Sequence, residues 1–278
     1  TTMDVLLSEE EQMVKNLARE FLDAECSTAL AREMELDDLG YPPSLWKQMA
    51  NLGWFGMALP EVYGGQGLPL TYLGIILEEV GRAIAPVPFH STMVAALTIA
   101  SDGSDEQKRE VLPKVSSGDS ILTWAFTERN PKYLPETIHT EAKKDGGGYV
   151  ITGTKLFVDN FNVAEKCLVI CRTAAESSNN KGISLFLVDT ASPGITHTPL
   201  VTIAKDKQSK VEFNQVRVSK SNLVGELNQG WPIAQTMLDQ ATVLLCAQMV
   251  GAARKDIEMA IEYSKNRVAF GRPIGAFQ

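Results

Sequence analysis

The stretch "RVAFGRPIGAFQ" (Arg267–Gln278) closes the 278-residue sequence and decides how the rest of it is interpreted. The segment before it, from Trp231 to about Asn266, contains no helix breaker after Pro232. At about 1.5 Å per residue, this segment predicts a helix roughly 50 Å long. Taken alone, the closing stretch has the composition of an ordinary helix end, because Arg, Gly and Pro are common stop residues.

The predicted long helix carries apolar residues around most of its circumference, which is typical of a helix buried among other helices. We expect either a partner subunit or residues beyond Gln278 to cover it. The apolar residues are Met237, Leu238, Val243, Leu244, Leu245, Met249 and Val250.

A different pattern fills residues 119–230. Short runs such as "KCLVICRT" and "GISLFLVDT" are rich in β-branched residues and are separated by Gly, Asn, Asp and Ser. The stretch "KDGGGYV" has the composition of a hairpin turn. This region therefore predicts an antiparallel β-barrel or sandwich.

The first third of the chain has helical patterns instead. "SEEEQMVKNLAREFL" opens with Ser8 and Glu11 in capping-box spacing, and "SDEQKREVLPKV" repeats the motif with Ser104 and Gln107. Both motifs predict helix N-termini.

Together these patterns predict a multi-domain α+β fold. We expect an N-terminal α-helical domain at residues 1–118, a middle antiparallel β-barrel or sandwich at 119–230, and the start of a C-terminal helical bundle at 231–278.

Composition excludes some classes of partner. The net charge of −8 argues against nucleic acid or an anionic membrane surface as the main partner. No apolar run is long enough to insert into a membrane, and the N-terminus has no signal-peptide pattern.

The cysteines and histidines do not indicate a metal site. Cys167 and Cys171 occupy alternate positions of a predicted strand, so they face one side of it, but no second pair accompanies them. His90, His139 and His197 have no metal-ligand spacing. We expect buried reduced thiols, which fit the cytoplasm or the mitochondrial matrix.

Four motifs, on the elements expected for them, carry a resemblance to a known family. They are "LPEVYGGQGLPL", "WAFTE", "ITGTKLFV" and "RVAFGRPIGAFQ". In this order, within an all-α, all-β and long-helix arrangement, the chain resembles the acyl-CoA dehydrogenase family of flavoproteins over its whole length.

The resemblance implies a reaction and a set of partners. The expected activity is FAD-dependent α,β-dehydrogenation of an acyl-CoA thioester, with electrons passed to an electron-transfer flavoprotein. A carboxylate removes the α-proton, and preorganised donors stabilise the enolate-like oxygen. The implied assembly is a homo-oligomer, as a dimer or dimer of dimers, or a heteromer with a related subunit.

Five residues match flavin contacts of the family. Trp124, Phe126 and Thr127 match the first flavin-binding strand, although the two aromatics also suit a core. Phe157 matches the aromatic that stacks on the ring, where Trp is usual. Asp159 stands where Thr often donates toward N5, and an ionised Asp cannot donate. Asp159 is then protonated, turned away, a sign of altered chemistry, or a solvated turn residue.

The closing stretch is implied to reach the FAD of a neighbouring subunit. Arg267 would hold its pyrophosphate, because a guanidinium forms paired hydrogen bonds to phosphate oxygens. Phe270 would pack beside the adenosine half, and Gln278 would lie near the same dinucleotide.

The sequence matches fewer of the family's substrate-binding and catalytic residues than of its flavin contacts. Asp239 and Thr242 match positions near the acyl-CoA. The family's helix-borne base position falls at Ala241, which is not acidic, so we expect the catalytic base beyond Gln278, with Asp239 as a minor alternative. The resemblance implies that the loop containing His90 borders the acyl pocket, and we expect His90 to be structural there rather than catalytic.

Two alternatives remain open. After "FTE", the family's Gly-Ser-Asp turn is replaced by "RNPKYLPETI", where Arg129 and Lys132 either compensate for the lost phosphate contacts or are only surface charges. This change and Asp159 favour a non-catalytic or half-site subunit of a heteromeric acyl-CoA dehydrogenase. A flavin oxidase or monooxygenase on the same scaffold is the other alternative.

Overall fold

The computed structural model describes residues 6–174 and 182–277, which form two compact units. The first, here the helical unit, takes its described residues from Thr1–Arg32, Leu70–Ala85 and Val243–Gln278. The second, here the sheet unit, comprises Glu33–Pro69 and Pro86–Thr242. The three-domain division expected from the sequence stays a prediction.

In the helical unit, α1 (Glu9–Glu25) packs against α4 (Leu70–Arg82). The predicted capping box at the start of α1 is confirmed, because the Ser8 hydroxyl accepts a hydrogen bond from the Glu11 N–H and the Glu11 carboxylate accepts one from the Ser8 N–H. Both helices bury one apolar face, as amphipathic helices of a core do. The fully buried residues are Ala18, Leu22, Leu73, Ile76, Leu77 and Val80.

The long helix α7 (Gly230–Asn266) has 37 residues, which confirms the predicted helix. It belongs to the sheet unit up to Thr242 and to the helical unit from Val243. Several of its apolar side chains are exposed in the chain described here, among them Met249 and Val250. None of the described helices combines the length and apolar character that a membrane span needs.

A small hairpin follows α7 in the helical unit. It pairs β9 (Val268–Ala269) with β10 (Arg272–Pro273), and a single 3₁₀ turn comes after it. The two turn residues, Phe270 and Gly271, both have positive φ, at 53° and 79°. Turns with this left-handed pair suit the twist of a hairpin.

The sheet unit contains α3 (Pro43–Asn51), α5 (Phe89–Asp102) and α6 (Asp105–Ser116). The second predicted capping box is confirmed at Ser104 and Gln107. α2 (Thr28–Leu36) crosses from one unit to the other.

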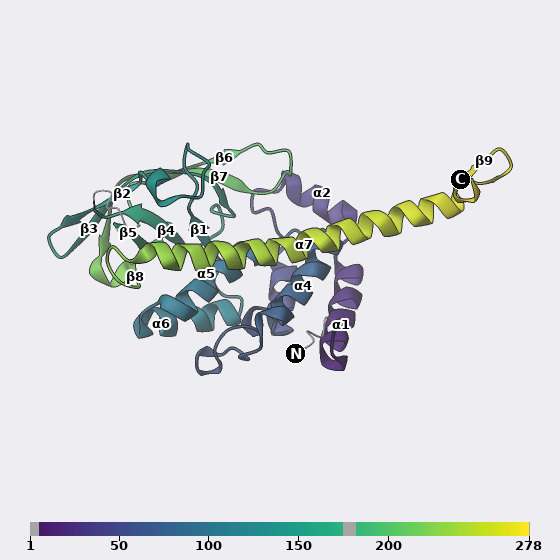
Figure 1. The fold of residues 1–278 in the computed structure, drawn as a ribbon, viewed down its shortest axis with the longest axis horizontal. Coiled ribbons are helices and arrows are strands. Elements are labelled where there is room, and N and C mark those ends of the chain that lie inside the picture. Colours follow the sequence, from purple (N-terminus) through teal and green to yellow (C-terminus); the bar gives the residue numbers. More distant parts are fainter. Residues whose placement is uncertain (1–5, 175–181, 278) are drawn as a thin grey trace. The chain divides into compact units, whose positions relative to one another are not determined.

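The strands of the sheet unit lie side by side in one sheet (Figure 1), in the order β6-β7-β3-β2-β4-β5-β8, with β1 beside β4. They are β1 (Leu122–Ala125), β2 (Glu141–Asp145), β3 (Gly148–Asp159), β4 (Lys166–Arg172), β5 (Ile183–Asp189), β6 (Ile195–Leu200), β7 (Gln208–Ser219) and β8 (Leu223–Val224).

The sheet does not close into a barrel. Among the described strands, β6 and β8 stand at opposite ends of the order and do not pair with each other. Most pairs are antiparallel, but β1 and β2 both pair with β4 in parallel. The result is a sandwich-like sheet, which agrees with the second of the two predicted architectures.

The core of the sheet unit contains both cysteines of β4. Cys167 and Cys171 are buried with free thiols on the same side of the strand, as the even spacing predicts. Burial raises the pKa of both thiols above their ordinary range.

Candidate functional site

The end of β1 and the end of β3 lie together in the sheet unit. The Leu156 N–H donates to the Thr127 carbonyl at 2.8 Å, and the Thr123 hydroxyl donates to the Asp159 carbonyl at 2.5 Å. Because these bonds join the two segments, Trp124, Thr127 and the stretch around Phe157 become neighbours. Sequence segments about 30 residues apart thus form one local surface.

Phe157 stands on a β-bulge. The register of β3 with β7 shifts between Lys155 and Val158, and Phe157 has a φ of 54°. This left-handed conformation is strained for an aromatic residue. Its side chain is 53% exposed, whereas Lys155 and Val158 are buried. The bulge therefore presents an aromatic ring at the surface between two buried positions of the strand.

Trp124 has a polar group free for binding, whereas Phe126 packs in the core. The indole N–H of Trp124 is buried, and no described residue accepts a hydrogen bond from it. A buried donor without a partner is unfavourable, so it indicates room for an acceptor from a bound group. Phe126 is a core residue, whose ring is stacked on Tyr133 at a centroid distance of 5.4 Å and tilted relative to Trp231 at 6.2 Å.

Asp159 is turned toward β7 and its preceding loop. Its carboxylate accepts a hydrogen bond from the Gln208 amide at 2.9 Å, and the same amide group donates to Asp206 at 3.0 Å. Burial, with the nearby charge of Asp206, raises the pKa of Asp159 to about 6, against a smaller lowering by Gln208. The carboxylate of Asp159 is thus engaged with Gln208, and its role toward a flavin stays a prediction.

A buried ion pair lies directly behind these residues. Lys155 is fully buried, and its ammonium donates to Glu128 at 2.8 Å and to the Phe126 carbonyl at 3.1 Å. Glu128 also accepts from the backbone N–H groups of His139 and Thr140 at 2.9 and 3.0 Å.

The sequence analysis did not single out this pair. Burial alone would raise the pKa of Glu128, but the charge and hydrogen bond of Lys155, with two backbone donors, lower it below its ordinary value. The available signal was a lysine at an inward position of "ITGTKLFV", in alternation with apolar residues.

On α7, the predicted substrate residues are exposed. Asp239 and Thr242 both face outward, and the Thr242 hydroxyl donates to the Leu238 carbonyl of the same helix at 2.7 Å. Ala241 is buried, and its carbonyl lies 2.9 Å from the ring nitrogen Nε2 of His90. Burial lowers the pKa of His90, although the contact with Ala241 opposes this shift. A neutral imidazole at this point donates from Nε2.

The residues predicted to reach a neighbouring FAD lie at the end of the helical unit. Phe270 is 95% exposed at the tip of the β9–β10 hairpin. Arg267 is exposed, and its backbone carbonyl accepts from the Ile274 N–H at 2.8 Å. The Arg272 guanidinium instead lies 4.1 Å from the Phe277 ring centroid. Gln278 lies outside the described residues.

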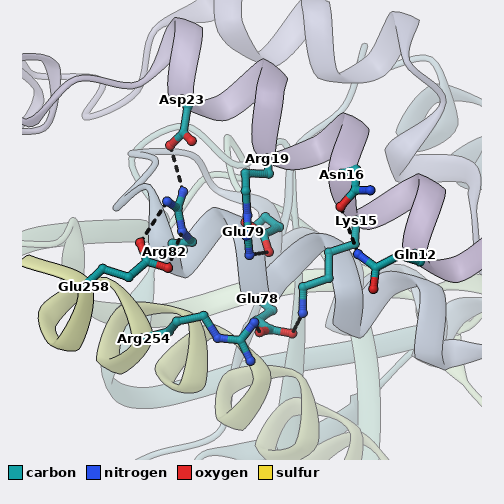
Figure 2. Close-up of polar contacts among 10 residues, drawn as sticks. All are labelled: Gln12, Lys15, Asn16, Arg19, Asp23, Glu78, Glu79, Arg82, Arg254 and Glu258. Atoms are coloured by element: carbon teal, nitrogen blue, oxygen red, sulfur yellow. Dashed lines mark hydrogen bonds and ion pairs between the residues drawn. The ribbon is translucent and has the colours of Figure 1, made fainter. Parts of the chain in front are cut away.

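The helical unit also contains an ion-pair network that the sequence analysis missed (Figure 2). Lys15 of α1 and Arg254 of α7 both pair with Glu78 of α4, at 2.7 and 3.0 Å. Arg19 forms two hydrogen bonds to Glu79, whose side chain is 1% exposed. These contacts join three helices that are distant in sequence.

A second part of the same network centres on Arg82. Its guanidinium binds Asp23 of α1 at 2.8 Å and Glu258 of α7 at 2.9 Å (Figure 2). Burial alone would lower the pKa of Arg82, but its hydrogen bonds to the two carboxylates raise it.

Comparisons with known proteins agree along the whole chain. Models of the acyl-CoA dehydrogenase N-terminal, middle and C-terminal domains match residues 8–119, 123–216 and 228–278. An acyl-CoA dehydrogenase of Bacillus subtilis (strain 168) is 31% identical over 278 residues, covering 98% of this chain and 73% of that protein.

Two further similarities cover nearly all of the chain. The mitochondrial short-chain specific acyl-CoA dehydrogenase of Rattus norvegicus is 31% identical over 280 residues, 99% of this chain and 67% of that protein. The ChsE4–ChsE5 complex of Mycobacterium tuberculosis matches with a TM-score of 0.89 at 28% identity, covering 99% of this chain and 72% of the other. Three domain models in the right order and relatives at 31% identity show that this chain belongs to the acyl-CoA dehydrogenase family, whose flavin cofactor is FAD.

Proposed function

We propose that the chain acts as an FAD-dependent acyl-CoA dehydrogenase, which removes a proton from the α-carbon and a hydride from the β-carbon of an acyl-CoA thioester. When bound, FAD supplies the acceptor for the hydride. The observation that carries this proposal is that the half-exposed ring of Phe157 and the unpartnered indole N–H of Trp124 stand on two segments joined by the Leu156–Thr127 hydrogen bond.

The residues of this surface fit a flavin. An aromatic ring on a strained bulge offers a flat apolar contact, and preorganisation of this kind lowers the free energy lost on binding. The Trp124 N–H suits a ring acceptor, and the half-buried Thr127 follows it on the same segment. We assign Trp124, Phe126 and Thr127 to the flavin-facing segment, with Phe126 acting through its backbone and its place in the core.

Asp159 has a different role in this proposal from the Thr that the family resemblance would place there. Its carboxylate is held by Gln208, and it contributes negative charge near the flavin rather than a donated hydrogen bond. The exposed Asp239 and Thr242 are assigned to the acyl-CoA.

We further propose that Arg267 and Phe270 act on the FAD of a second subunit. An exposed guanidinium beside an exposed aromatic suits a dinucleotide, because it offers charge for the pyrophosphate and a flat face for the adenine. Phe270 lies in the hairpin turn with a positive φ, and its ring meets that of Phe277 edge-on at a centroid distance of 6.3 Å. Arg267, Phe270 and the undescribed Gln278 stay proposals for this role.

The electrons are proposed to leave through an electron-transfer flavoprotein, as the family resemblance implies. A bacterial cytoplasmic or a mitochondrial matrix location accords with the relatives from Bacillus subtilis and from rat mitochondria.

A visible spectrum tests this function directly. The purified protein should be yellow, and anaerobic addition of a matching acyl-CoA should bleach it, because the flavin becomes reduced. Acyl-CoAs of several chain lengths should be compared. A colourless protein that takes up no added FAD contradicts the proposal.

A second candidate is a half-site subunit of a heteromeric dehydrogenase. It is favoured by the loop "RNPKYLPETI" in place of a Gly-rich turn and by the likeness to a complex of two named chains, ChsE4 and ChsE5. Co-purification distinguishes the two functions. The heteromer predicts less than one FAD per chain when this chain is purified alone and a full complement once the partner subunit is added.

A further inference from the structure

The Lys155–Glu128 pair is the most deeply buried ion pair among the described residues, with side-chain exposures of 0% and 7%. Removing two charges from water is unfavourable, and replacing such a pair by apolar residues of similar volume is often neutral or stabilising. Stability alone therefore does not account for this pair. A role in fixing local geometry does.

The pair adds side-chain bonds between three segments, namely β3, the chain just past β1 and the chain ahead of β2. From β3, the Lys155 ammonium binds the Phe126 carbonyl, which lies just past the end of β1. From the same segment past β1, Glu128 binds the N–H groups of His139 and Thr140 ahead of β2. All these bonds are made by two side chains, so loss of either one weakens several connections between the segments together.

These segments carry the residues assigned to the flavin. Trp124 and Thr127 lie within four residues of Glu128 in the chain, and Phe157 is two residues beyond Lys155. Between them, the Leu156 N–H binds the Thr127 carbonyl at 2.8 Å. Because Lys155 points inward immediately before the bulge, it anchors the strand at the point where Phe157 turns outward.

From this arrangement we propose that Lys155 and Glu128 are positioning residues, which set the spacing between the Trp124–Thr127 segment and the Phe157 bulge that FAD requires. The inference rests on the proposed function, since it takes these two segments to be the flavin surface. Neither side chain needs to touch the cofactor. Each acts through the backbone that it holds.

Four variants of the purified protein separate an effect on the geometry of the FAD surface from an effect on the stability of the fold. Lys155→Met leaves Glu128 buried without a cation and should lower both Tm and FAD affinity. Lys155→Met combined with Glu128→Leu removes both charges and should recover most of the Tm. We expect the double variant still to bind FAD about tenfold more weakly than wild type, because the hydrogen bonds that set the spacing are absent.

Glu128→Gln is the milder variant, since it keeps the shape of the side chain and its acceptor oxygen. It should fold, and the altered charge should change the visible circular dichroism of bound FAD. The matched control is Lys143→Met, which breaks the exposed Lys143–Glu141 pair of the same sheet, with side chains 77% and 50% exposed. This control should leave both FAD affinity and the dichroism unchanged.

The possible failures are distinguishable. If the double variant, or Glu128→Gln, binds FAD with wild-type affinity and dichroism, the pair has only a structural role and this inference is overturned while the proposed function stands. If the wild-type protein itself takes up no FAD, the proposed function fails and this inference fails with it.

Discussion

Gly81 of α4 and Gly251 of α7 each lie against the backbone of the other helix. A Cβ added to Gly81 would come within 1.9 Å of the Gln248 carbonyl oxygen, and one added to Gly251 within 1.7 Å of the Glu78 carbonyl oxygen. Only glycine permits so close a crossing. The same crossing brings Arg254 to Glu78 and Glu258 to Arg82 (Figure 2).

We expect Gly81→Ala and Gly251→Ala each to destabilise the protein by about 1–3 kcal/mol, because a methyl group forces the helices apart. Urea unfolding measures this. Gly74→Ala is the matched control on α4, since nothing lies within 4 Å of its added Cβ. It should be neutral or stabilise by up to about 1 kcal/mol, because Ala favours helix. Equal effects at Gly74 and Gly81 would contradict the close crossing.

Arg19→Met should lower the free energy of unfolding by about 3 kcal/mol, because it leaves the buried carboxylate of Glu79 without its cation. The comparison is Lys47→Met, which removes the cation of an exposed pair with Asp119 and should cost about 1 kcal/mol or less. Chemical denaturation of both variants at one pH checks the difference. If both variants lost similar free energies of unfolding, burial of Glu79 would not add to the stability contributed by its ion pair.

Asp159 predicts a pH dependence of stability. Its pKa is raised from 3.8 to about 6 in the folded protein, so its contribution is fully present below pH 3.8 and is lost as the pH rises through 6. Relative to Asp159→Asn, wild type should therefore lose up to about 3 kcal/mol between pH 4 and 7. Urea titrations of both proteins across this range measure the change.

The control for this pH dependence has the opposite sign. Hydrogen bonds from Ser117 and Lys47 lower the pKa of the exposed Asp119. Wild type should therefore gain stability relative to Asp119→Asn as the pH rises from 3 to 5. Parallel curves for wild type and Asp159→Asn would rule out a raised pKa at Asp159.

Phe157 links backbone strain to cofactor binding. Phe157→Ala and Phe157→Gly should both weaken FAD binding, measured by flavin fluorescence, because the exposed ring is gone. Glycine should nevertheless be more stable than alanine here by about 1 kcal/mol, since it relieves the left-handed φ of 54°. Phe157→Trp should retain binding. Tight FAD binding by Phe157→Ala would remove Phe157 from the flavin surface.

Arg267 tests whether two subunits share one FAD. Arg267→Met should lose FAD without a change in the Tm of the apoprotein, because the side chain is exposed, whereas Lys265→Met on the last turn of α7 should retain FAD. Mixed oligomers of Arg267→Met and Phe157→Ala subunits should recover about a quarter to a half of the FAD sites if each site draws on two chains. No recovery on mixing would place both residues in a site within one chain.

Local patterns in the sequence determined most of the elements. The uninterrupted helical run predicted α7, the Ser8–Glu11 and Ser104–Gln107 spacings predicted two helix starts, and the turn between Asp145 and Gly148 was visible as "KDGGGYV". All of these depend on residues a few positions apart, which is why one sequence is enough to find them.

Only the tertiary structure decided how those elements meet. Lys155 pairs with Glu128, which lies 27 residues away in the sequence, and Arg82 pairs with Glu258, which lies 176 residues away. The open sheet, the bulge at Phe157 and the turned carboxylate of Asp159 also depend on strands paired across the fold. Periodicity reports which face of an element is apolar, but not which partner that face or a buried charge will meet. That choice is made by packing and by the unfavourable free energy of leaving a buried polar group without a partner.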